Sequence, residues 1–361
     1  MKTKALKNMI LLMLVLVFTL QTLNVFCADT YRHPAEFEKM ESLIIVWNFR
    51  NWGYEANVED YHPIFREIVR EAQSEVTVYI VSNDGYEISQ YLEENQVSLD
   101  HIVFLSVRAF PEKAWVRDFG PYFVDHEGDR IILDTGYLDT LDGDQPDPYR
   151  SANAFPLSFS GAVRDFIYEP VLLRLDGGNF LTNGDGLILT TENITHSNIQ
   201  KRPFYSVDEL KTLVNEKFGG ELHVLKEGPA LVSAHIDTAT KFINPHTVFV
   251  GEGSAEDKRQ YPGYQALEEN VRQLSQIQYR GRPLNIVRIP LPHVPNSPVT
   301  THPYINSLIL NHKVLVPVFN IPEDEQVLAV YRDQMPGYEI IGIDCSRIIN
   351  TGGAIHCLTK E

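Results

Sequence analysis

A unit of close to sixty residues recurs along this 361-residue sequence, and it constrains the fold more than any other feature. Its clearest part is a pair of short β-type runs around a polar turn, which is typical of a hairpin. The segments 122–134, 179–191, 241–251 and 307–318 have this form. Regular spacing of one motif predicts a fold assembled from like units rather than a single continuous sheet.

Three of the hairpins are followed by an amphipathic helix and then by a strand-like run. The helix predicted after the second hairpin opens with Ser206 and Glu209 in the pattern of a capping box. It carries apolar residues along one stripe: Leu210, Leu213, Val214 and Phe218. An earlier, less regular copy contains "SLIIVW", "DYHPIFREIVREAQSE" and "VTVYIVS". Five such units account for most of the chain, so the sequence predicts an α/β fold of five ββαβ-type repeats.

Residues capable of chemistry recur with the same period, just before a hairpin or where the next would start. They are Asp118, Asp176, the pair His235 and Asp237, and Cys357. The steps are 58 residues (176 − 118), 61 (237 − 176) and 120 (357 − 237, two repeats). In a closed ring of like units, equivalent positions converge on the axis. A cysteine four residues before the end can therefore meet an aspartate from the first third of the chain.

Each motif has an ordinary structural interpretation when it is taken alone. "HID" can be a strand pair with both side chains on one face, "WVRDFGP" a turn before a strand, and "DGGN" a plain turn. Gly177 and Gly178 add weight, because glycine lets the backbone approach a ligand closely. The shared period, not any one motif, predicts a site.

Two aspartates, a histidine and a thiol at one centre suit a guanidinium substrate. Paired carboxylates match the forked N–H donors of a planar guanidinium. Its carbon is a poor electrophile, so attack requires a strong nucleophile such as a cysteine thiolate. Histidine can protonate departing ammonia and then deprotonate the incoming water. The implied reaction converts a guanidino to a ureido group and needs neither a metal nor another cofactor.

The motifs "WVRDFGPYFV", "DGGN", "HIDTATKF", "HPYINSLILN", "VLVPV", "MPGYEIIG" and "AIHC" together resemble the Porphyromonas-type peptidylarginine deiminase and agmatine deiminase family. The resemblance implies the pentein fold, an α/β propeller of five ββαβ-type pseudo-repeats around a central active site. The resemblance also implies that Asp118 and Asp237 bind the guanidinium and that His235 is the acid/base. It implies that Cys357 is the nucleophile, which forms a covalent thiouronium, and that Trp115 forms a wall of the pocket.

The substrate within this family is left open between agmatine, on a route to putrescine, and arginine in a peptide or protein, which would be citrullination. The peptidylarginine enzyme of the family holds a substrate carboxylate with paired arginines, whereas the corresponding acidic segment here has only Arg150. Agmatine deiminases resemble this chain in carrying an acid, here Asp176, before "GGN". Thr300, with Asn296 and His302, lies in the fourth connecting segment and is expected to line the pocket.

The N-terminus has the pattern of a secretory signal peptide. Three lysines precede an apolar run from Met9 to about Leu20, and "VFCA" follows as a cleavage site near Cys27 or Ala28. We therefore expect residues 1–27 to be removed and residues 28–361 to form one deiminase domain that is secreted, periplasmic or at the cell surface. The net charge of −17 becomes −20 without the three lysines, which argues against nucleic acid and anionic membranes as partners and favours a cationic ligand.

Three rival classes remain. Cys/His amidases and proteases generally place the cysteine at a helix N-terminus, often well before the histidine, unlike the order here. A metallohydrolase could use His235, Asp237 and His293 or His302, but the sequence has no HExxH motif or clustered His/Cys set. A catalytically inactive secreted binding scaffold is the third. If Cys357 is the nucleophile it cannot be bonded to Cys345, so we expect Cys345 to be a spectator.

Overall fold

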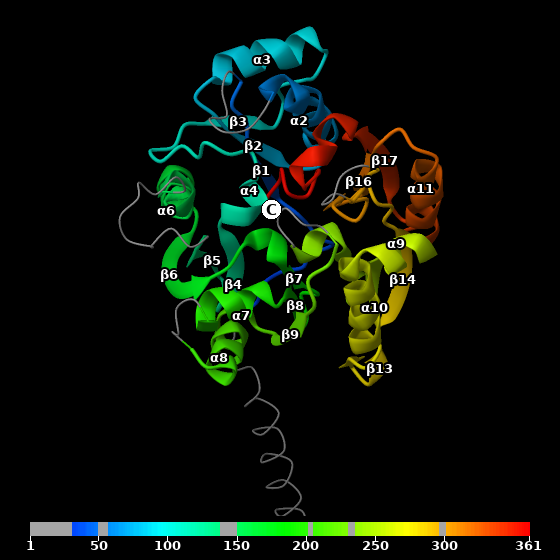
Figure 1. Ribbon diagram of the computed structural model, residues 1–361. Helices are drawn as coiled ribbons and strands as arrows, with labels where there is room; N and C mark the ends of the chain where they lie inside the picture. Colours follow the sequence, from blue (N-terminus) through cyan, green and yellow to red (C-terminus); the bar gives the residue numbers. More distant parts are fainter. Residues whose placement is uncertain (1–30, 50–56, 138–149, 201–204, 230–234, 296–300) are drawn as a thin grey trace, which may run out of the picture.

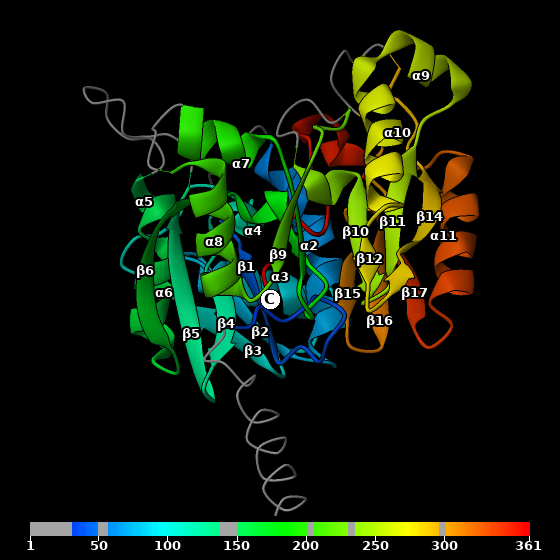
Figure 2. The same cartoon turned by 90° about the horizontal axis from the view of Figure 1, so that it is seen from below.

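The computed structural model describes residues 31–49, 57–137, 150–200, 205–229, 235–295 and 301–361. Within these residues, five three-stranded sheets surround a common centre, with helices toward the outside and the C-terminal residue near the middle (Figure 1). In the view at right angles, β4, β5 and β6 lie on one side and β10, β11, β14, β16 and β17 on the other, with the C-terminal residue between them (Figure 2). The expected ring of five repeats is confirmed.

The second to fifth units share one topology: a hairpin, a helical segment, and a strand parallel to the hairpin's second strand. The second unit contains β4 (Tyr122–His126), β5 (Asp129–Gly136), α5 (Arg150–Asn153), α6 (Phe155–Val163) and β6 (Ile167–Arg174). The third contains β7 (Phe180–Thr182), β8 (Leu187–Thr191), α7 (Asn193–Thr195), η2 (His196–Gln200), α8 (Val207–Phe218) and β9 (Glu221–Leu225). The fourth contains β10 (Thr240–Asn244), β11 (Thr247–Glu252), α9 (Ala255–Gln260), α10 (Pro262–Leu274), the small pair β12 (Gln278–Tyr279) and β13 (Arg282–Pro283), and β14 (Asn285–Pro290). The fifth contains β15 (Leu308–Leu310), β16 (Lys313–Val318), α11 (Glu323–Gln334) and β17 (Glu339–Asp344), followed by η4 (Ser346–Thr351).

The first unit lacks a hairpin, and the end of the chain completes it. Its elements are β1 (Ser42–Val46), α2 (Val58–Ala72), β2 (Thr77–Val81), α3 (Gly85–Glu94) and β3 (Ile102–Leu105), and its three strands are parallel. Lys360 pairs with Ile44 of β1 in an antiparallel bridge, with N···O distances of 2.7 and 3.0 Å. The residues after Cys357 thus occupy the place of a hairpin's first strand, and the ring closes between the two ends of the described chain.

Local sequence explains several element boundaries. Ser206 and Glu209 form the expected capping box at the start of α8, and Gly219 ends the helix with φ 72°. Between β4 and β5, Glu127 and Gly128 have φ values of 52° and 90°, the positive pair that a two-residue hairpin turn requires.

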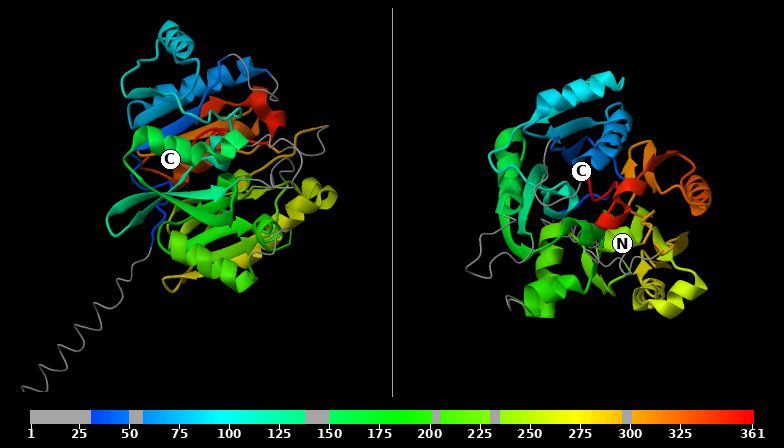
Figure 3. Two further views of the ribbon diagram at one scale, coloured as in Figure 1. Left: turned by 90° about the vertical axis from the view of Figure 1, so that its left-hand side faces the viewer. Right: turned by 45° about the horizontal axis from the view of Figure 1, so that its top comes forward.

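The largest hydrophobic core joins the first and fifth units. It contains buried residues of β1, α2, β15, β16 and α11, together with Leu358, which is fully buried. Figure 3 (right) shows α3, in cyan, at the edge of the molecule away from the centre. α2 contacts β2 on one side and β17 and η4 on the other, so it lies between the first and fifth units. Because the residues around Cys357 are enclosed by this core and by the bridge to β1, the terminal segment is held rather than frayed.

Residues 1–30, the expected signal peptide among them, lie outside the described residues. In the part that is described, no helix has the length and apolar character required to cross a bilayer.

Candidate active site

The periodic positions converge on the centre of the ring. Asp118 lies in the short helix α4 (Val116–Phe119) before β4, and Asp176 immediately precedes η1 (Gly177–Asn179) before β7. Asp237 lies in η3 (Ile236–Thr238) before β10, and Cys357 lies just before the residue that bridges to β1. Each side chain therefore comes from the entry to a different sheet.

Asn306 lies just before the fifth unit, two residues before β15, and was not predicted from the sequence. It falls between Asp237 and Cys357, 69 residues after the first (306 − 237) and 51 before the second (357 − 306). Its Nδ2 donates to Cys357 Sγ at 3.1 Å, and its Oδ1 accepts from the N–H groups of Ala354 and Cys357. The two-repeat gap between Asp237 and Cys357 was the signal that could have identified it.

His235 is buried between two carboxylates. Its Nδ1 lies 3.3 Å from Asp118 Oδ1, and its Nε2 lies 3.3 Å from Asp176 Oδ2. Burial lowers the pKa of His235, but the negative charge of Asp118, reinforced by Asp176, raises it well above its ordinary value. Burial raises the pKa of Asp118 despite the opposing attraction of His235. This arrangement favours an imidazolium that can donate a proton.

Asp237 faces a different histidine. Its Oδ2 lies 2.7 Å from Nδ1 of His356, and both side chains are buried. Burial raises the pKa of Asp237, but the hydrogen bond and charge of His356 outweigh burial and lower it. The ordinary interpretation of "HID" as a strand pair does not hold, because the two residues lie at a 3₁₀ turn that directs them to different partners.

The thiol of Cys357 lies beside these groups. Its Sγ is 3.5 Å from Asp237 Oδ2 and receives the Asn306 hydrogen bond. Burial raises the pKa of Cys357 well above its ordinary value, the negative charges of Asp237 and Asp118 add to the effect, and the Asn306 hydrogen bond opposes it. The free site thus favours a neutral thiol, and a positive charge brought to the carboxylates would favour the thiolate.

Two buried carboxylate oxygens have no hydrogen-bond partner within the described residues: Asp118 Oδ1 and Asp237 Oδ1. A Cβ on Gly178 would lie 2.9 Å from Asp118 Oδ1, 3.2 Å from Asp237 Oδ1 and 2.7 Å from His235 Nδ1. The missing side chain therefore leaves the two oxygens facing one small space. Buried acceptors without partners are costly, so they indicate a ligand that supplies donors.

The other candidate residues have separate roles in the geometry. A Cβ on Gly177 would lie 1.9 Å from the carbonyl oxygen of Arg117, so this glycine allows α4 and η1 to pack. A Cβ on Gly353 would lie 2.9 Å both from Trp115 Cζ3 and from Cys357 Sγ, which places the indole beside the thiol. Thr300 and Asn296 lie outside the described residues.

His293 and His302, which a metallohydrolase would combine with His235 and Asp237, contact other residues. The ring of His293 stacks on Tyr261 at 4.1 Å, and His302 Nδ1 lies 3.0 Å from the carbonyl oxygen of Pro292. Among the described residues, no group of three or more His, Cys, Asp and Glu side chains is placed to hold a metal ion. Cys345 is a buried free thiol, as is Cys357.

Comparison with known proteins shows which chains this one resembles. A sequence model of the family described as Porphyromonas-type peptidyl-arginine deiminase matches residues 32–361. The agmatine deiminase of Pseudomonas aeruginosa (strain LESB58) is 24% identical over 375 residues, covering 92% of this chain and 96% of that protein. Among solved structures, the agmatine deiminase of Enterococcus faecalis superposes with a TM-score of 0.76 at 20% identity, covering 92% of this chain and 95% of the other. The C. jejuni agmatine deiminase gives 0.73 at 20% identity, with the same coverage.

Proposed function

The chain belongs to the Porphyromonas-type peptidyl-arginine deiminase family, and from this premise we propose that it hydrolyses a guanidinium group to a ureido group and ammonia through a covalent intermediate on Cys357. It is a pentein hydrolase that acts on carbon–nitrogen bonds of linear amidines. The observation that carries the proposal is a pair of buried carboxylate oxygens, Asp118 Oδ1 and Asp237 Oδ1, which face one space beside the thiol. Within the described residues neither accepts a hydrogen bond, although Asp118 Oδ1 forms an ion pair with His235.

Binding of the cation activates the nucleophile. A guanidinium that donates to Asp118 and Asp237 satisfies both oxygens and places its positive charge beside Sγ. That charge offsets the carboxylates, which otherwise raise the pKa of Cys357, and the thiolate becomes accessible when the substrate is present. Asn306 holds Sγ from another direction.

The chemistry then takes two steps. Sγ, whose proton has passed to solvent, bonds to the guanidinium carbon and one C–N bond breaks. His235 gives its proton to the departing amino group, which leaves as ammonia, and a thiouronium remains on Cys357. Water then adds to the same carbon and gives one proton to His235; the C–S bond breaks, the second proton passes to sulfur, and the ureido product is released. The raised pKa of His235 suits the first proton transfer.

Agmatine is the substrate that we propose first, because relatives that match most of the chain carry that name. Asp176 faces Nε2 of His235, which supports a role in holding the acid/base residue. A second role, contact with the amine of agmatine, is tested by Asp176→Asn. A loss confined to agmatine would support amine contact, and an equal loss on every guanidine would support the histidine role alone.

Arginine in a peptide or protein is the second candidate, which would make the reaction citrullination. It is favoured by the family description and by the signal-peptide pattern, from which we also propose export and cleavage near Cys27 or Ala28. N-terminal sequencing of the exported protein tests that cleavage.

The deciding experiment offers agmatine, free arginine, and peptides with internal or C-terminal arginine to the purified protein and measures ureido product and ammonia. Cys357→Ala is assayed beside it. We expect Cys357-dependent release of both products from at least one guanidine. No turnover of any of them would favour an inactive binding scaffold, and activity lost on chelation would favour a metallohydrolase.

A further inference from the structure

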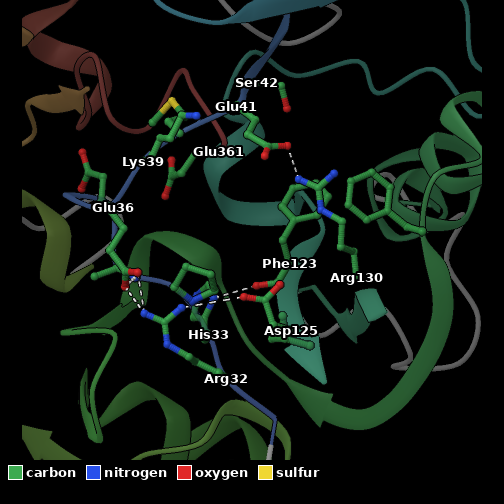
Figure 4. Close-up of a pocket in the computed structure, with 16 residues that line it drawn as sticks. Arg32, His33, Glu36, Lys39, Glu41, Ser42, Phe123, Asp125, Arg130 and Glu361 are labelled. Atoms are coloured by element: carbon green, nitrogen blue, oxygen red, sulfur yellow. Dashed lines mark hydrogen bonds and ion pairs between the residues drawn. The ribbon is translucent and has the colours of Figure 1, made fainter. Parts of the chain in front are cut away.

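Glu36 lies in the segment before β1, at the boundary between a surface cavity and the candidate active site. The cavity has a volume of about 360 Å³, and Glu36 and Glu361 are among its lining residues (Figure 4). None of the candidate catalytic side chains lines it. Glu36 can therefore act on the site only through the residues that it contacts.

One carboxylate connects three segments that carry active-site groups. Glu36 Oε1 accepts from the N–H of Ile309 at 2.7 Å. Its Oε2 forms an ion pair with Lys241 Nζ and lies 3.3 Å from His356 Nε2. The three partners belong to β15, to β10 and to the terminal segment, so they come from different sheets.

Each partner lies close in sequence to a group of the site. Ile309 follows Asn306 by three residues, Lys241 follows Asp237 by four, and His356 immediately precedes Cys357. These contacts are buried, with side-chain exposures of 10% for Glu36, 2% for His356 and 1% for Lys241. Hydrogen bonds in such surroundings fix the positions of the segments that make them.

His356 connects Glu36 to the reacting groups. Its Nε2 faces Glu36 and its Nδ1 faces Asp237 Oδ2 at 2.7 Å. A ring held at one nitrogen can swing about that contact, whereas a ring held at both is fixed. A fixed ring keeps Oδ2 of Asp237 engaged and directs the unpartnered Oδ1 toward the substrate space.

We propose that Glu36 is a positioning residue for the deimination site: it holds His356, and through His356 it orients Asp237 beside Cys357. The inference rests on the proposed function, because it concerns how the carboxylate that binds the guanidinium is aimed. The ion pair with Lys241 alone would be a structural contact, and the test has to separate the two roles.

The test compares two double variants in which Lys241→Met removes the buried cation. In Glu36→Gln/Lys241→Met, the amide can still accept from Ile309 and donate to His356 Nε2. In Glu36→Met/Lys241→Met, a side chain of similar volume can do neither. Neither variant retains the buried ion pair, so stability effects of that pair are common to both.

The readout is the ratio of two alkylation rates at Cys357, with 2-chloroacetamidine and with iodoacetamide. In both reactions Sγ bonds to carbon as halide leaves and the thiol proton passes to solvent. Only the amidinium reagent carries a planar cation that the carboxylates can align. If a variant only makes the residues around Cys357 more mobile, both rates change together. If Asp237 is wrongly oriented, the rate with 2-chloroacetamidine falls relative to the rate with iodoacetamide.

We expect the wild-type protein and the Gln variant to prefer the amidinium reagent, and the Met variant to lose this preference by at least about tenfold, as for a misplaced binding group. Glu41→Gln is the matched control, because Glu41 lines the same cavity and pairs with the exposed Arg130.

An equal ratio in the Gln and Met variants would overturn the inference. No preference in the wild-type protein would instead refute the proposed function, and the inference with it. If the Met variant does not fold, His356→Asn is assayed, since asparagine keeps a donor for Asp237 but cannot reach Glu36. The same fall in ratio is then expected, and an unchanged ratio would overturn the inference.

Discussion

Asp118→Asn removes one charge from the site with almost no change in volume. In the part of the chain that the structure describes, Asp118 Oδ1 has no hydrogen-bond partner, and it lies 3.3 Å from Nδ1 of His235. A charge-assisted hydrogen bond to a guanidinium is worth about 1.5–3 kcal/mol. Loss of the charge also weakens the ion pair with the imidazolium, whose value at this distance is no more than about 5 kcal/mol in a medium of effective dielectric constant near 20.

Together these effects predict a loss of about 3–4 kcal/mol in transition-state binding, or about 10²–10³-fold in kcat/KM. The fold should persist. Burial outweighs His235 and raises the pKa of Asp118, so the charge is not what stabilises the native state. We expect the midpoint of thermal unfolding to move by no more than about 4 °C.

The assay measures initial rates of ureido product against substrate concentration, beside thermal unfolding of the same preparation. Asp125→Asn is the control, because Asp125 lies in β4 with its side chain about half exposed and pairs only loosely with Arg32, at 3.7 Å. Near-normal kcat/KM in Asp118→Asn would refute the assignment of Asp118 to the guanidinium. A loss that accompanies unfolding would refute the claim that its charge serves the site rather than the fold.

Three further predictions concern the thiol and the space beside it. Asn306→Ala should reduce kcat by about ten- to a hundredfold, because Sγ loses a hydrogen-bond donor worth about 1.5–3 kcal/mol. An unchanged kcat would refute the assignment of Asn306 to the active site. Burial and the two carboxylates raise the pKa of Cys357, so its reaction with iodoacetamide should be slow near pH 7 and faster as pH rises. The rate of reaction with 2-chloroacetamidine should reach its plateau at lower pH, and coincident pH profiles would contradict this account. Gly178→Ala should abolish turnover because its Cβ would lie 2.7 Å from His235 Nδ1. Gly161→Ala should be close to wild type in the same assay, because no atom of the described residues lies within 4 Å of its Cβ.

Much of the fold could be predicted from the sequence because its helices and hairpins depend on local residue patterns. The hairpins, the helices after them and the capping box of α8 depend on residues a few positions apart. The period then placed Asp118, Asp176, His235, Asp237 and Cys357 near one axis, and the structure brings them together. That these residues perform catalysis stays a prediction until variants are assayed.

The remaining features depend on contacts between residues far apart in the chain. The bridge from Lys360 to Ile44 and the contact of Glu36 with His356 each span more than 300 residues (360 − 44 and 356 − 36) and have no local signature. Asn306 was missed because amides are common before strands, and because it lies 69 residues after Asp237 (306 − 237) instead of about sixty. The alternative of a strand at His235 could not be dismissed from the sequence, because a short polar motif does not distinguish a strand from a 3₁₀ turn.

The covalent step can be measured most directly by acid-quenching the protein during turnover of agmatine or of whichever guanidine proves to be the substrate. Peptide mass spectrometry then locates any adduct. The mechanism predicts an adduct with the mass of the substrate less ammonia on Cys357, none on Cys345, and no product from Cys357→Ala. Product formed by Cys357→Ala at the wild-type rate, or an adduct on Cys345 instead, would contradict the mechanism.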